Sequence, residues 1–74
     1  MIITFQPDVR QRAQLIWFCT QAGTRHEPGD VAGTLACHFD DTTELMAWHR
    51  DFVTCLGWAP MAIEVMVSDA EADF

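Results

Sequence analysis

The middle of the chain alternates hydrophobic and polar positions on either side of a Pro28-Gly29 pair. Proline suits the second position of a type II turn, and glycine tolerates the positive φ that the third position needs. Antiparallel strands folded around this turn place most apolar side chains on one face and most polar ones on the other, as in a half-buried pair of strands. The pattern therefore predicts a long hairpin over residues 15–27 and 30–40.

Shorter patterns at the two ends of the chain predict three more elements. Residues 1–5 alternate and indicate a first strand, and residues 61–67 alternate again and indicate a last one. Residues 41–57 place apolar side chains at helical spacing, starting from a capping Asp41, and indicate a helix. The acidic tail, residues 68–74, is expected to fray.

Together these elements predict one α+β domain over residues 1–74 with the order β-β-β-α-β. A single helix would pack on one face of a four-stranded, mostly antiparallel sheet. The alternative is a ferredoxin-like order, βαββαβ, in which residues 8–22 form a helix instead of a strand. The aromatic, β-rich run at residues 15–19 favours the strand.

Composition narrows the class of protein and the compartment. A chain of 74 residues buries a modest core, and no apolar run approaches the roughly 18 residues that span a membrane. The start of the chain has no secretory leader, and the three cysteines are widely spaced, so we expect reduced thiols in a cytoplasm. Eleven acidic residues against four arginines give a net charge of −7, which disfavours direct nucleic-acid binding.

The predicted hairpin places one thiol beside one imidazole, Cys19 and His38. Such a pair forms a nucleophile and its base in some enzymes. No third residue orients this imidazole and no glycine-rich turn supplies an oxyanion hole, so we expect no catalytic residue, and keep a thiol or metal site at this pair as an alternative. The candidate zinc ligands are Cys19, His26, Cys37, His38, His49 and Cys55. They lack the close pairwise spacing of a zinc knuckle, so we expect no metal and no cofactor.

A protein-binding surface is the remaining prediction. The uncovered sheet face is expected to expose an aromatic residue and a methionine among acids, a composition typical of interfaces. The acids near the start of the predicted helix over residues 41–57 could also serve only as helix caps. The acids of the tail recur at every second residue, as on one face of a strand. The predicted partner-binding residues are Trp17, Asp40, Asp41, Glu44, Glu64, Met66, Asp69 and Glu71.

The charge predicts the kind of partner. A domain with a net charge of −7 is attracted to a basic surface that binds nucleic acid. By occupying that surface it can block nucleic acid sterically and electrostatically. This indicates an inhibitor of a host nuclease or defence complex, a DNA mimic of the type that phages encode as anti-CRISPR proteins. The alternative is a homodimeric regulatory or structural domain.

Overall fold

The computed structural model describes the backbone of residues 1–72 and the side chains of residues 1–70. The elements in chain order are β1 (Ile2–Phe5), α1 (Val9–Ala22), β2 (His26–Pro28), β3 (Leu35–His38), α2 (Thr42–Leu56) and α3 (Ile63–Ala72). The described residues thus form three strands and three helices, where the sequence predicts four strands and one helix.

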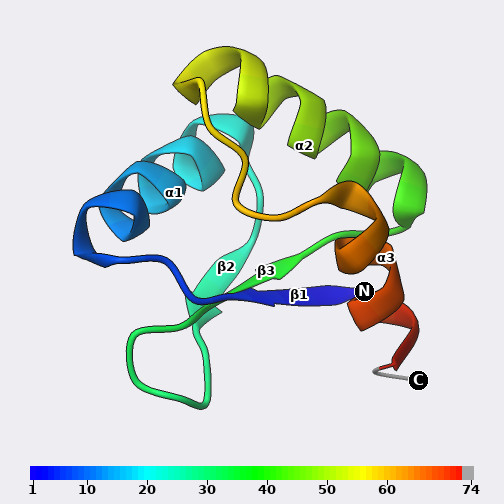
Figure 1. The fold of residues 1–74 in the computed structure, drawn as a ribbon, viewed down its shortest axis with the longest axis horizontal. Helices are drawn as coiled ribbons and strands as arrows, with labels where there is room; N and C mark the ends of the chain where they lie inside the picture. The colour runs from blue at the N-terminus through cyan, green and yellow to red at the C-terminus, as the bar shows by residue number, and fades with distance from the viewer. Residues whose placement is uncertain (73–74) are drawn as a thin grey trace.

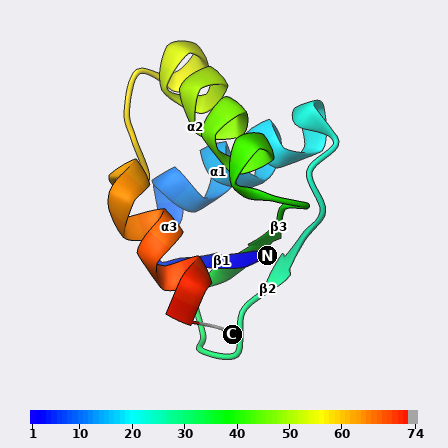
Figure 2. The same ribbon diagram turned by 90° about the vertical axis from the view of Figure 1, so that its right-hand side faces the viewer.

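The three strands form one antiparallel sheet with β3 in the centre, in the order β1-β3-β2. Cys37 lies opposite Ile3 on one side and opposite His26 on the other, so these three residues share a face. Helices α1 and α2 lie over this inner face, and α3 packs along β1 (Figures 1 and 2).

The core is a cluster of aromatic rings between the sheet and the helices. The Trp48 ring of α2 has ring centroids of Phe5, Phe18, Phe39 and Phe52 within 5.7 Å. Every helix, together with β1 and β3, contributes buried side chains to this core. Helix α2, which carries Trp48, is therefore held in place by buried side chains from the other two helices and from β1 and β3.

The predicted hairpin over residues 15–27 and 30–40 is wrong. Its first half belongs to α1, and the real hairpin pairs only β2 with β3, across a loop of residues 29–34. The register also differs: the predicted turn at Pro28-Gly29 places Ala36 opposite Gln21, whereas Ala36 lies opposite Glu27. Pro28 ends β2 and does not centre a two-residue turn.

Helix α1 forms because its end signals outweigh the β propensity of its middle. Asp8 accepts a hydrogen bond from the Gln11 amide, and the Gln11 side chain accepts one from the Asp8 amide, which completes a capping box. Gly23 ends the helix at φ 71°, a left-handed conformation that glycine adopts readily. Leu15, Phe18 and Cys19 then form the buried stripe at helical spacing.

The last predicted strand, residues 61–67, is also wrong, because Ile63–Ala72 form helix α3. Met66 and Ala70 are buried one turn apart, which is the helical period and extends past the residues that alternate. The tail predicted to fray is helical as far as Ala72. The ferredoxin-like alternative matches the observed order up to α2 and ends in a strand where the structure has α3.

The first strand and the long helix lie where the sequence predicts them. Asp41 caps α2 by accepting a hydrogen bond from the Glu44 amide at 2.8 Å, and Gly57 ends the helix at φ 75°. The buried stripe of this helix is Leu45, Trp48 and Phe52. Cys55, which the periodicity assigns to this stripe, is exposed.

Candidate functional site

Three predicted partner-binding acids, Asp40, Asp41 and Glu44, gather at the start of α2. All three are exposed. They are also used locally, because Asp41 caps the helix and Glu44 Oε2 accepts a hydrogen bond from the Asp40 amide at 2.6 Å. The cap fixes the positions of the carboxylates, and the helix N-terminus favours their negative charge. The cluster is therefore both a structural cap and a preordered acidic surface.

Two of these acids border an open polar depression of about 460 Å³. Asp40 and Glu44 line it on one side, and Arg25 and His38 also line it. No ion pair between an acid and a base of this depression is present in the described residues. The depression joins predicted residues at the start of α2 to groups near the ends of β2 and β3. One hydroxyl, of Thr24, and one imidazole, of His38, are among its lining groups, and no cysteine or serine is.

The predicted residues of the last segment divide between the surface and the core. Glu64 and Asp69 are exposed on α3, whereas Met66, which the sequence predicts at the surface, is fully buried. The predicted strand spacing of the tail acids is wrong for Asp69 and Glu71, which are helical. The Glu71 side chain and all of Asp73 lie outside the described residues.

The sequence predicts Trp17 on the sheet, but the residue lies on α1. Its side chain is 50% exposed. The uncovered sheet face instead carries Glu27, Ala36 and His38, together with Ile2 and Thr4 of β1. The predicted grouping of Trp17 with Met66 and acids on one face is therefore wrong, because the tryptophan belongs to a helix and the methionine to the core.

The predicted pair of Cys19 and His38 does not exist. Cys19 is buried on α1, and His38 Nε2 lies 2.9 Å from Glu27 Oε1 on the other face of the sheet. Cys19 Sγ contacts Cys37 Sγ at 3.7 Å instead. The hydrogen bond from Cys37 lowers the pKa of Cys19, whereas donating this bond, together with burial, raises the pKa of Cys37 far above its ordinary value.

The charge of the chain is divided unevenly, a feature that the sequence analysis missed because it considered only the total. Residues 1–37 carry three acids and three arginines and are neutral. Residues 38–74 carry eight acids and one arginine, and so account for the whole net charge of −7. Counting the charges by segment would have found this from the sequence alone.

The acids of the second half are mostly without a basic partner. Within residues 38–70, every acid is exposed, and only Asp51 lies close to a basic side chain, with Arg50 Nε at 3.5 Å. The start of α2 and helix α3 lie on the same side of the molecule (Figure 1). We call residues 38–74 the acidic half and residues 1–37 the neutral half.

Two exposed apolar side chains accompany these acids. Met46 of α2 is 53% exposed and Val65 of α3 is 47% exposed. Met46 lines a shallow depression on α2 with Thr43, Ala47 and Arg50. Methionine and arginine are both enriched in protein interfaces. The acidic half thus offers apolar contact area beside its charge.

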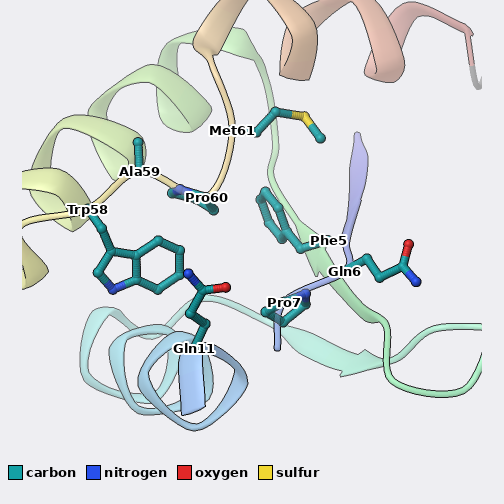
Figure 3. Close-up of a pocket in the computed structure, with 8 residues that line it drawn as sticks. All are labelled: Phe5, Gln6, Pro7, Gln11, Trp58, Ala59, Pro60 and Met61. Carbon is teal, nitrogen blue, oxygen red and sulfur yellow. The ribbon is translucent and has the colours of Figure 1, made fainter. Parts of the chain in front are cut away.

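One further pocket, of about 200 Å³, lies where the connection between β1 and α1 meets the connection between α2 and α3. Figure 3 shows Trp58 and Pro60 on one side and Phe5 and Pro7 on the other. None of its eight lining residues titrates near neutral pH, and the Trp58 indole donates its hydrogen bond to Gln14 at 2.9 Å. It is smaller than typical ligand pockets, which start near ~300 Å³.

No group of three or more metal-ligating side chains lies together in the part of the chain that the structure describes. No helix among the described residues has the length and hydrophobicity needed to cross a membrane. Comparisons of this chain with protein-family models, with curated proteins and with solved structures gave no match.

Proposed function

We propose that this protein binds a basic, nucleic-acid-contacting surface of another protein and blocks it. The observation that carries the proposal is the charge of the acidic half: its net charge of −7 is the charge of the whole chain, and all its described carboxylates are exposed. A nuclease or a defence complex that grips nucleic acid through lysine and arginine is the partner class with the matching charge.

The α2 cap supports binding by a preordered surface. Asp41 and Glu44 are already fixed by hydrogen bonds to backbone amides, so less side-chain entropy is lost when they meet a cation. In this proposal the two carboxylates take the place of neighbouring phosphates on the basic surface. Met46, next along the helix, supplies apolar contact area that phosphates lack and that a protein interface uses.

Long-range attraction supports the same proposal. Charges at an exposed surface act over a Debye length of ~8 Å at physiological ionic strength, so an acidic half of this kind raises the rate of association with a basic surface. Inhibition then follows from occupancy, because the partner's groove cannot hold nucleic acid and the acidic half together. No covalent chemistry is required.

The test captures partners on the tagged, full-length protein from a lysate of its native host. Proteins that bind nucleic acid through a basic surface should be retained at low salt, and should elute when either high salt or duplex DNA is added. Each such protein is then purified, and its DNA binding is measured with increasing amounts of this chain. Competition between the chain and DNA supports occupancy, whereas simultaneous binding of both contradicts it.

A further inference from the structure

The inner face of the sheet brings together two cysteines that are far apart in the chain. Cys19 lies near the end of α1 and Cys37 lies in the central strand β3. Their sulfur atoms are 3.7 Å apart, and neither side chain is exposed to solvent. The third cysteine, Cys55, is exposed on α2, so it provides an internal comparison.

The contact is close enough for the two sulfurs to react with each other. A disulfide has a sulfur-sulfur distance of about 2.0 Å and joins elements whose backbones already lie side by side. Helix α1 covers the inner face of the sheet (Figure 2), and Cys37 shares this face with Ile3, so the two cysteine side chains already meet. Small rotations of the two side chains would bring the sulfurs together without unfolding either element.

We propose that Cys19 and Cys37 are a redox-active dithiol, which a small peroxide converts into an intramolecular disulfide. In the first step the Cys19 thiolate attacks one peroxide oxygen and the O–O bond breaks. Cys19 becomes a sulfenic acid, and the departing hydroxide takes up the proton that the Cys19 thiol released, which gives the first water. In the second step the Cys37 sulfur attacks the Cys19 sulfur, the S–O bond breaks, and water leaves with the Cys37 proton. Two thiols are oxidised, and one hydrogen peroxide is reduced to two waters.

The surroundings assign the order of attack and the oxidant. Cys19 lies near the end of α1, whereas Cys37 lies in the central strand β3, so an oxidant reaches Cys19 first and Cys37 resolves the sulfenic acid. The Cys37 thiol, in contact with the Cys19 sulfur at 3.7 Å, stabilises the thiolate that forms there. Burial of both side chains excludes bulky disulfide reagents, while hydrogen peroxide is little larger than water. Cys19 lies one turn before the Gly23 cap, and helix ends open locally at low cost, which admits such an oxidant.

The disulfide would join positions separated by 18 residues and would tie α1 to the central strand. The closed segment includes the end of α1 and the edge strand β2. Closing a loop of this length restricts the unfolded chain, and in a domain of this size the oxidised protein should melt at least ~10 °C above the reduced one.

The experiment uses the full chain with Cys55→Ser, which removes the exposed thiol and leaves the buried pair unchanged. The folded protein is treated with a few equivalents of hydrogen peroxide, quenched, and weighed by intact mass spectrometry. The expected result is a loss of about 2 Da, no thiol left to alkylate after denaturation, and the higher melting temperature. A reducing agent should restore the original mass and melting temperature.

Trypsin identifies the bond, because each cysteine of the chain lies on its own peptide. Cleavage after Arg12, Arg25 and Arg50 puts Cys19 in residues 13–25 and Cys37 in residues 26–50. The two peptides should run as one species before reduction and as two after it. The same digest of the wild-type protein separates this bond from any bond made by Cys55.

Controls make a negative result decisive. Cys37→Ser in the same background should accumulate oxygen adducts on Cys19 and no linked peptides. Retention of both free thiols in the folded Cys55→Ser protein would overturn the proposal, and so would a disulfide that forms only in urea. Cross-linked dimers in place of the internal bond would also overturn it.

Discussion

The neutral half and the acidic half differ in charge but share one core. Residues 1–37 supply α1 and all of the sheet except His38, the last residue of β3, and their acids and arginines balance. Residues 38–74 supply α2 and α3 and carry the charge of −7. Yet Phe52 of α2 packs against Phe18 of α1 with ring centroids 5.0 Å apart. Buried side chains therefore come from both halves, whereas the net charge comes from one half, whose described acids lie on α2, on α3 and at the two positions before α2.

The largest expected effect tests the shared core. Phe52→Ala removes a fully buried ring from contacts with Phe18, Trp48 and Trp58, and should lower the free energy of unfolding by ~3–5 kcal/mol. In a domain this small, much of the protein would be unfolded at 25 °C. Val53→Ala, at the neighbouring exposed position, is the control and should cost less than ~0.5 kcal/mol in urea titrations. Equal effects of the two variants would show that the halves do not share a core.

The next effect compares the two helix caps. Asp8 of the neutral half and Asp41 of the acidic half accept hydrogen bonds from the amides three residues on. Replacing either by alanine should cost ~0.5–2 kcal/mol, whereas Asn at either position keeps an acceptor and should cost less. Thermal melts of the four variants make the comparison. A cost at only one of the two sites would mean that only that carboxylate caps its helix.

The smallest effect concerns the unpaired charge on α3. Asp69 lies in the C-terminal part of this helix, where the helix dipole disfavours a carboxylate, and its neighbours along the acidic half repel it. Asp69→Asn should therefore stabilise the protein by a few tenths of a kcal/mol, ~0.3, at low salt and by less in 1 M salt, where screening is strong. Asp30→Asn in the neutral half is the control. Destabilisation by Asp69→Asn would show that this carboxylate makes a favourable contact.

Elements were predicted correctly where the hydrophobic period and the end signals agree, and wrongly where these local signals compete. Strand β1 and helix α2 have one period each and clear ends, and both were predicted. In residues 15–19 the β-rich composition competes with the Asp8 and Gly23 end signals, and the end signals prevail because α1 buries Leu15 against the core. Residues 61–67 are too few to distinguish the strand period of 2 from the helix period of 3.6. The helical period becomes visible only with Ala70, which is buried four residues after Met66.

The candidate sites follow the same division. The acids at the start of α2 were predicted because capping is local in sequence, and the structure places all three together. The contact of Cys19 with Cys37 was not predicted, because it exists only if residues 9–22 are helical and packed on β3. Met66 was assigned to the surface for the same reason, since a wrong period assigns a side chain to the wrong face.

Neutralising three acids in each half separates the contribution of the acidic half to partner binding from that of the neutral half. Asp40→Asn, Asp41→Asn and Glu44→Gln together remove three charges and keep the acceptors that cap α2. Asp8→Asn, Glu27→Gln and Asp30→Asn remove the same charge from the neutral half and keep the cap of α1. Each variant is titrated against a partner captured by the wild-type protein, in a series of salt concentrations.

If the acidic half is the binding surface, the α2 variant binds at least ~10-fold more weakly and with a flatter salt dependence, while the variant of the neutral half binds like the wild type. Equal weakening by both variants would mean that only the total charge matters. Unchanged binding of the α2 variant would contradict the claim that the acidic half is the binding surface.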